Sequence, residues 1–203
     1  MTTAVVMLSG GYDSVAALEM TLRDRRAACI FVDYGQPYRL QEKRAVDIVA
    51  EHYADHPHFL GVRILRLDML TSDVPVPEYV PLRNLVIASA AANVAQSIGA
   101  CEVVTGSKTD ILRPGDPYSF RDSCVQFYRM LEKVVFFATE SGMTALRFEM
   151  PIAGWDKVQV LKLLTNAGFD LASLWSCYRD SIEPCGTCHH CIELAHAREA
   201  LHA

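Results

Sequence analysis

Strand-like and helix-like segments alternate along the first half of this chain, and this alternation restricts the fold more than any other feature. The apolar runs that predict buried strands are residues 3–8, 27–35, 63–70 and 101–107. The helical periodicity between them covers residues 14–25, 39–54 and 84–100. Alternation with short connections predicts an α/β fold, in which helices cover both faces of a doubly wound, mainly parallel sheet. Ligands bind such sheets at the carboxyl ends of the strands.

The second half of the chain is less regular. Proline and glycine predict a loop over residues 108–120, followed by a helix at 121–142, a strand and turn at 145–155, and a helix at 157–168. No internal repeat or long linker divides the sequence. Residues 1–203 are therefore expected to form a single α/β domain with a C-terminal metal-binding segment at about 174–203.

The helix expected at residues 39–54 is amphipathic. An apolar face that should pack on the sheet is formed by Leu40, Ala45, Ile48, Val49 and Tyr53.

Charge and hydropathy exclude some classes of function. The formal net charge of −5 argues against a protein that grips nucleic acid through a basic face. The sequence has no apolar run of about 18 residues that could span a membrane, and its first residues lack a signal-peptide pattern. We therefore expect a cytoplasmic protein without direct contact to nucleic acid. In a reducing compartment, its seven cysteines are expected to be thiols or metal ligands.

The stretch Ser9–Ser14, "SGGYDS", connects the first expected strand to the first expected helix, and we call it the glycine loop. Its glycines allow close approach of a ligand, its serines offer hydroxyl donors, and the helix start offers unpaired N–H groups. Together these groups predict a cradle for phosphate or pyrophosphate. The lysine of the Walker motif is absent. The alternative is a simple turn in which Asp13 or Ser14 caps the helix.

Four cysteines near the C-terminus have the spacing C-x7-C-x2-C-x2-C, namely Cys177, Cys185, Cys188 and Cys191. Four thiolates satisfy a tetrahedral zinc ion and leave no open position, so the pattern predicts a structural zinc site. An iron–sulfur cluster and four unrelated thiols are the alternatives. The neighbouring His189 and His190 are expected to face solvent.

Several motifs together resemble one enzyme family. S-G-G-x-D-S looks like the pyrophosphate loop of the ATP pyrophosphatases (the PP-loop superfamily), and the cysteines after "WSCY" resemble the C-terminal segment of the 7-cyano-7-deazaguanine synthase (QueC) family. "DYGQ" at residues 33–36 matches a second-strand motif of that family, and "YVPLRN" at 79–84 resembles its VPGRN motif with Leu82 in place of glycine. "PIAGWDKVQVLKLL" places Lys157 at the lysine of the family.

The resemblance implies an adenine nucleotide alpha hydrolase-like fold and an ATP-dependent carbon–nitrogen ligase. Such an enzyme adenylates 7-carboxy-7-deazaguanine, amidates it with ammonia and dehydrates the amide to the nitrile, 7-cyano-7-deazaguanine (preQ0), for queuosine or deazapurine biosynthesis. ATP, Mg²⁺ and Zn²⁺ are the implied cofactors, and a homodimer is implied. The alternatives are a related ligase that joins the same carboxylate to another amine, for instance on a protein, a tRNA-modifying thiolase, and a non-catalytic binding module.

The resemblance also assigns residues to roles. Catalysis is expected of Asp13, Ser14 and Lys157. ATP binding is expected of Leu8, Ser9, Gly10, Gly11, Asp13, Ser14, Asp33, Gln36, Arg83, Asn84 and Lys108, substrate binding of Asp122 and Arg121, and metal binding of the four cysteines. The competing interpretations are a solvated helix lysine for Lys157, helix capping for Arg83 and Asn84, and a helix-start aspartate for Asp122.

The sequence departs from the family in the segments that face the substrate or follow the cysteines. Tyr38 replaces a histidine, Leu194 replaces an arginine, and Ser123–Cys124 stand where the family has Cys-Arg. The glycine loop is intact. ATP-dependent activation is therefore better supported by the sequence than the identity of the acceptor amine.

Overall fold

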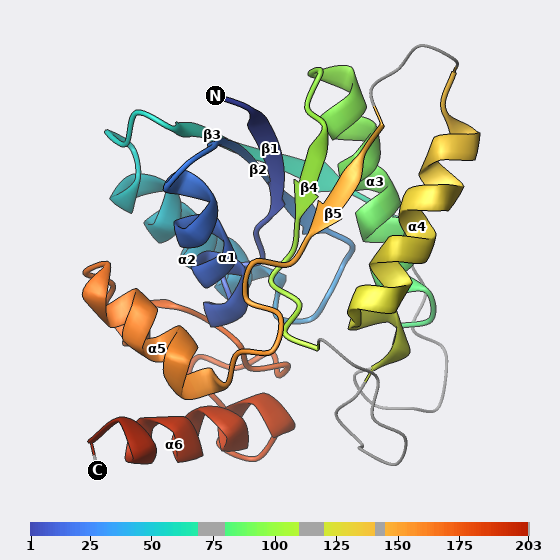
Figure 1. The fold of residues 1–203 in the computed structure, drawn as a ribbon. Helices are drawn as coiled ribbons and strands as arrows, with labels where there is room; N and C mark the ends of the chain where they lie inside the picture. Colours follow the sequence, from blue (N-terminus) through green and yellow to red (C-terminus); the bar gives the residue numbers. More distant parts are fainter. Residues whose placement is uncertain (69–79, 110–119, 141–144, 203) are drawn as a thin grey trace.

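The computed structural model describes residues 1–68, 80–109, 120–140 and 145–202. It contains one five-stranded sheet with the order β3-β2-β1-β4-β5, in which every neighbouring pair is parallel (Figure 1). The strands are β1 (Thr3–Met7), β2 (Arg26–Asp33), β3 (Phe59–Arg66), β4 (Glu102–Val104) and β5 (Arg147–Glu149). The parallel sheet that the alternating sequence pattern predicts is thus confirmed.

Helices cover both faces of this sheet. They are α1 (Tyr12–Leu22), α2 (Arg39–His52), α3 (Arg83–Ser97), α4 (Val125–Ala138), α5 (Lys157–Asn166) and α6 (His189–His202), with short 3-10 turns η1 (Arg121–Ser123) and η2 (Leu171–Ser173). Side chains of α1, α2, α5 and α6 share one hydrophobic core, and side chains of α3 and α4 share another. Figure 1 shows these two groups of helices on opposite sides of the strands.

The central strand β1 contributes to both cores. Ala4 and Val6 belong to the core on the α1 side, and Val5 belongs to the core on the α3 side, all three without exposed surface. Strand side chains alternate between faces, so a strand covered on both sides must be apolar at every position. This explains the unbroken apolar run at the start of the sequence.

The strand order reverses at β1. The chain adds β2 and β3 on one side of β1, then returns to add β4 and β5 on the other side. The loops after β1 and β4 therefore diverge at a topological switch point, where parallel α/β sheets bind their ligands. The glycine loop follows β1 at this point.

The fold differs from the sequence-based expectation in the bounds of β3, in the buried face of α2 and in the helix expected at residues 121–142. The third strand begins at Phe59, four residues before the expected start at Arg63, and ends at Arg66. On α2, Leu40 is 69% exposed, whereas Val46 is 2% exposed and packs in the core. Leu40 lies in the first turn of α2, and the first buried residue of this helix is Ala45.

The helix expected at residues 121–142 is also divided. Cys124 is extended, and the backbone N–H of Val125 donates to the carbonyl oxygen of Thr109 at 3.2 Å. This pairing with the loop after β4 separates η1 from α4. Residues 141–144 lie outside the described residues.

In the part of the chain that the structure describes, no helix combines the length and the apolar character needed to cross a lipid bilayer.

Candidate active site

The glycine loop leaves the amino end of α1 without a side-chain cap. The N-cap residue is Gly11, which has no side chain to cap the helix, and no side-chain capping bond forms. The interpretation in which Asp13 or Ser14 caps the helix is therefore wrong. An uncapped helix start directs N–H groups and a positive dipole end toward any anion in front of it.

The two serines of the loop bond to each other and to its backbone. The Ser14 hydroxyl donates to the Gly11 carbonyl oxygen at 2.8 Å, and it lies 3.1 Å from both the backbone nitrogen and the hydroxyl of Ser9. The hydroxyl of Ser9 in turn accepts from the Gly11 N–H at 3.4 Å. Ser14 thus orders the loop in this structure, and its proposed contact with ATP would require these bonds to rearrange.

Glycine is required in the loop by packing as well as by ligand approach. Gly10 has a φ of +79°, and a Cβ there would lie 2.7 Å from the carbonyl oxygen of Glu42 on α2. A Cβ on Gly106, in the loop after β4, would lie 2.6 Å from backbone atoms of Asp13 and Ser14. The two loops of the switch point therefore touch backbone to backbone, and neither position has room for a side chain.

Lys157 joins the carboxyl end of the sheet to the glycine loop. It is the first residue of α5 and is 7% exposed, which contradicts its interpretation as a solvated helix lysine. Its ammonium donates to both carboxylate oxygens of Asp13 at 2.8 Å and lies 3.3 Å from the carboxylate of Glu193 on α6. The other carboxylate oxygen of Glu193 accepts from Lys108 at 2.6 Å. Two lysines and two carboxylates thus form one continuous network.

Opposite charges in this network shift the pKa values of Lys157 and Glu193 toward their charged forms. Burial would lower the pKa of Lys157, but the negative charges of Asp13 and Glu193 raise it above its usual range. Burial likewise would raise the pKa of Glu193, but Lys157 and Lys108 lower it to about 2. Lys157 and Glu193 are therefore both charged near neutral pH.

A second group of polar side chains surrounds Arg83 at the start of α3. The hydroxyls of Tyr34 and Tyr178 lie within hydrogen-bonding reach of the guanidinium, and its Nε donates to the side-chain oxygen of Asn84 at 3.2 Å. The rings of Tyr38 and Tyr178 stack with centroids 5.2 Å apart. Tyr38, which replaces the family histidine, is therefore part of this aromatic surface.

Arg83 and Asn84 do not cap α3. The N-cap residue is Leu82, which has a φ of 56° and no side-chain cap. This left-handed conformation favours glycine, the residue that the family motif has at this position. Asn84 instead donates to the backbone carbonyl oxygen of Asp122 at 3.3 Å, which brings η1 next to α3. Tyr79 of this motif lies outside the described residues.

The remaining predicted residues lie at the same edge of the sheet. Leu8 is buried after β1, and its backbone N–H donates to Ile30 at 2.9 Å. Asp33 accepts from the Gly35 N–H at 3.0 Å and so forms the turn after β2. Arg121 is exposed on η1, and Asp122 is half-buried there.

Gln36 is 3% exposed, and its side chain bonds to the turn after β2, to β2 and to α2. Its amide donates to Glu42 at 2.7 Å and to the Val32 carbonyl oxygen at 3.2 Å. Burial raises the pKa of Glu42 to about 7. Gln36 thus shapes the turn that presents Asp33 and Tyr34.

The four cysteines converge beside α6. Their sulfur atoms all lie within 4.8 Å of one another, and Gly186 has the positive φ of 70° that the tight turn between them requires. The backbone N–H of Cys185 donates to the sulfur of Cys177, and the backbone N–H of Cys188 donates to the sulfur of Cys185, each at 3.3 Å. Such N–H groups stabilise thiolate charge.

This donor set fits a tetrahedral metal ion. Zn–S bonds of about 2.3 Å place tetrahedral sulfurs about 3.8 Å apart, and the sulfurs of Cys185 and Cys191 are 4.0 Å apart. Burial raises the pKa of Cys177, and it raises the pKa of Cys191 to about 12. Four thiolates would therefore persist together only around a cation.

His189 and His190 do not simply face solvent. Both are half-buried, and the His190 ring meets the Tyr178 ring edge-on at 4.4 Å. Burial and the nearby charge of Lys157 lower the pKa of His190 to about 4, so its imidazole is neutral. A ring nitrogen of each histidine lies within 4.8 Å of a carboxylate oxygen of Glu193. Because Glu193 already contacts two ammonium groups, we assign no metal ion to these three residues.

Sequence analysis did not assign Glu193, Tyr178 or Gly106 to the site. Glu193 is an ordinary helix glutamate in the sequence, and only the fold brings it to Lys108 and Lys157. The close approach at Gly106 likewise depends on two loops that are about ninety residues apart.

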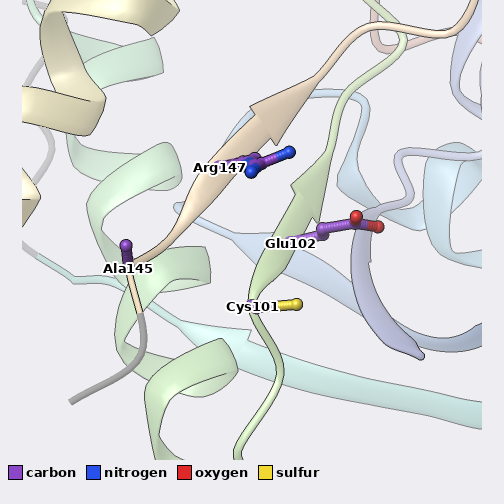
Figure 2. A pocket seen from close by; sticks show the side chains of 4 residues that line it. All are labelled: Cys101, Glu102, Ala145 and Arg147. Carbon is purple, nitrogen blue, oxygen red and sulfur yellow. The ribbon is translucent and has the colours of Figure 1, made fainter.

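A separate hollow lies at the opposite edge of the sheet. Figure 2 shows its lining residues, Cys101, Glu102, Ala145 and Arg147, which lie at or just before the amino ends of β4 and β5. Glu102 is held there by Arg25 at 3.0 Å. The predicted site residues lie at the carboxyl ends, so this hollow is not part of the site.

Known proteins resemble this chain over most of its length. The protein named 7-cyano-7-deazaguanine synthase from Desulforudis audaxviator is 26% identical to this chain, over 97% of this chain and 96% of that protein. The protein of the same name from Stutzerimonas stutzeri is 30% identical, over 93% of this chain and 89% of that protein. The protein of that name from Thermoplasma acidophilum is 27% identical, over 93% of this chain and 84% of its own.

Two solved structures share the fold. One is a 4-thiouridine synthetase–RNA complex with bound ATP, with a TM-score of 0.60 and 16% identity over 98% of this chain and 50% of that chain. The other is the U34-tRNA thiolase NcsA from Methanococcus maripaludis with its 4Fe-4S cluster, with a TM-score of 0.57 and 16% identity over 98% of this chain and 65% of that chain.

The model of the family described as "Queuosine biosynthesis protein QueC" matches residues 3–201. Because this match spans almost the whole sequence, the chain belongs to the QueC family.

Proposed function

We propose that this chain is an ATP-dependent 7-cyano-7-deazaguanine synthase. It adenylates the carboxylate of 7-carboxy-7-deazaguanine, exchanges AMP for ammonia to give the amide, and uses a second ATP to remove water and form the nitrile. Membership in the QueC family and the shared name of the curated relatives support the proposal. The observation that carries it is the buried ammonium of Lys157 on Asp13, at the glycine loop in front of the uncapped α1.

The groups of the chain suit the first step of this reaction. When a carboxylate oxygen attacks the α-phosphate, negative charge develops on the departing pyrophosphate, and fixed positive groups lower the barrier. Lys157, Lys108 and the amino end of α1 are the positive groups at the glycine loop. Asp13 orients the ammonium of Lys157 and offers the carboxylate that fits Mg²⁺, an ion that supplies further positive charge when ATP binds.

We assign the deazaguanine ring to the surface formed by η1 and the start of α3. The Asp122 carboxylate can accept two N–H bonds from a guanine-like edge, and Asn84 fixes the backbone of Asp122. Arg83 and the stacked tyrosines Tyr38 and Tyr178 offer flat surfaces and a cation near the turn after β2. Arg121 is exposed beside this surface and is the second proposed substrate contact.

We assign Zn²⁺ to the four cysteines as a structural ion. Elemental analysis of the purified protein should give about one zinc per chain. Iron accompanied by visible absorbance would favour an iron–sulfur cluster instead.

The decisive assay combines the purified chain with ATP, Mg²⁺, 7-carboxy-7-deazaguanine and ammonium, and follows products by mass spectrometry. Successive appearance of the amide and the nitrile, with pyrophosphate released at each activation, is the expected result. Amide alone, or an adduct with an added amine, would indicate the related ligase that joins the carboxylate to another acceptor. Absence of substrate-dependent pyrophosphate release would overturn both assignments.

We also propose that the enzyme is a cytoplasmic homodimer. None of the seven cysteines forms a disulfide, which suits a reducing compartment. On α4, Met130, Val134 and Phe137 follow one another at helical spacing and are 68%, 60% and 85% exposed, which suits a contact between copies. Light scattering during size-exclusion chromatography should give twice the mass of one chain.

A further inference from the structure

Glu193 connects two lysines that come from different loops. Lys108 lies after β4, and Lys157 begins α5 after β5. Both ammonium groups contact the single carboxylate of Glu193, at 2.6 Å and 3.3 Å. The side chains of Lys108 and Glu193 are only 19% and 28% exposed, so the contacts are partly shielded from water.

Without this carboxylate the two lysines would not remain together. Like charges at short range repel, most strongly where water is excluded. Lys157 would keep its two bonds to Asp13. Lys108 has no comparable second contact for its ammonium among the described residues, and a long lysine side chain turns its charged end to water where it can.

The position of Glu193 is set by the C-terminal segment. Leu194 and Ala197 anchor α6 in the core beside α5, and Cys191 belongs to the metal cluster. The same segment also contacts the glycine loop. The backbone N–H of Trp175 donates to the Gly10 carbonyl oxygen at 3.1 Å, and the Arg198 guanidinium donates to the Tyr12 hydroxyl at 3.2 Å. The C-terminal segment therefore contacts the glycine loop and also carries Glu193, the carboxylate that bridges Lys108 and Lys157.

Resting on the ATP-dependent function proposed above, we propose that Glu193 is a positioning residue for the phosphate end of the ATP site. It does not contact the nucleotide. It holds the ammonium groups of Lys108 and Lys157 next to each other, so that both face the same anion beside the glycine loop. Through Cys191 and α6, it also links the metal-binding segment to the geometry of that site.

The sign of the effect distinguishes this role from simple electrostatics. A carboxylate near a polyphosphate repels it, so if Glu193 contributed only charge, its neutralisation would tighten ATP binding. If Glu193 positions the lysines, neutralisation weakens ATP binding although a negative charge has been removed.

The test compares Glu193→Gln with Glu199→Gln, which removes the same charge from an exposed position of the same helix. ATP binding with Mg²⁺ is measured by calorimetry without the deazaguanine substrate, and kcat and KM are measured with it. Glu193→Gln should weaken ATP binding about tenfold and lower kcat by about 10- to 100-fold, as expected for misplaced groups. Its KM for the carboxylate substrate and its metal content should stay unchanged, and Glu199→Gln should match wild type.

A double-mutant cycle with Lys108→Met provides a readout that a merely structural role would not move. Once Lys108 is removed, Glu193→Gln should cost clearly less in ATP affinity than in the wild-type background. If Glu193→Gln fails to fold, Glu193→Asp retains the charge with a shorter reach and should weaken ATP binding severalfold.

Unchanged or tighter ATP binding in Glu193→Gln, additive effects in the cycle, or a wild-type chain that binds no ATP would overturn the proposal. Only the last of these outcomes also contradicts the synthase assignment; the first two are independent of it, because ATP binding is measured without the deazaguanine. A wild-type chain that binds ATP in a Glu193-dependent way but makes no nitrile would refute the assigned reaction alone.

Discussion

Replacement of Gly106 by alanine tests whether backbone contact between the two loops of the switch point supports the site. Gly106 does not have a positive φ, so alanine can adopt its backbone conformation without strain. The added Cβ would instead lie 2.6 Å from the Asp13 carbonyl carbon and the Ser14 nitrogen, where ordinary contacts begin at 3.4 Å. The loops must therefore separate by about 0.8 Å, the difference between these distances.

Both stability and catalysis should respond to this separation. The neighbouring atoms are backbone and cannot rotate away, so we expect a loss of about 1–3 kcal/mol in the free energy of unfolding. A displacement approaching 1 Å at Asp13 should lower kcat/KM for ATP by up to about 100-fold. Urea unfolding and a pyrophosphate-release assay measure the two effects.

Gly99→Ala is the matched control. Gly99 has a φ of +69° with no atom within 4 Å of its Cβ position, and it precedes β4 at the opposite edge of the sheet. Alanine there should cost about 1–2 kcal/mol in stability through backbone strain alone, with kcat/KM unchanged. Wild-type kinetics in Gly106→Ala, or an equal kinetic loss in Gly99→Ala, would refute the reasoning.

Four further predictions concern the rest of the site. Asp13→Asn should lower kcat by about 100-fold or more while the protein remains folded; equal activity would remove Asp13 from the mechanism. Leu82→Gly should raise the free energy of unfolding by about 0.5–1 kcal/mol in urea titrations, because relief of the left-handed strain exceeds the added chain entropy; a loss would contradict the strained conformation. The raised pKa of Glu42, about 7 against 4.5, means that the folded protein keeps a proton that the unfolded chain releases. The contribution of Glu42 to the free energy of unfolding should therefore fall as pH rises from about 4.5 to 7, by up to about 3 kcal/mol. The lowered pKa of His190 acts in the opposite direction in both proteins, so the difference in pH-dependent unfolding between wild type and Glu42→Gln measures the Glu42 contribution, and a difference that does not change with pH would contradict it. Removal of the proposed cysteine-bound metal with a chelator should weaken ATP binding and change the fluorescence of Trp175, whose indole donates to the Cys177 carbonyl oxygen at 2.7 Å; unchanged ATP binding would separate the segment from the site.

Local sequence patterns determined the larger part of this fold. Alternating apolar runs and helical periodicity are short-range signals, so the parallel sheet and all five strands were predictable, apart from the early start of β3 at Phe59. The cysteine spacing is also local, because the chelating residues are close in the chain and converge with a single glycine turn at Gly186. The glycine loop was recognisable because its pattern consists of consecutive residues between a strand and a helix.

The tertiary structure alone decided which groups meet at that loop. Lys157 could be read as an exposed helix lysine until burial against Asp13, 144 residues away, gave it a partner. Glu193 and Gly106 carry no signal of their own, because their roles arise from contacts between segments that the sheet order brings together. The sequence by itself therefore determined most of the secondary structure, the cysteine cluster and the glycine loop, which depend on neighbouring residues. Packing of distant segments at the carboxyl edge determined the charge network, because burial and pairing of charges exist only once the chain has folded.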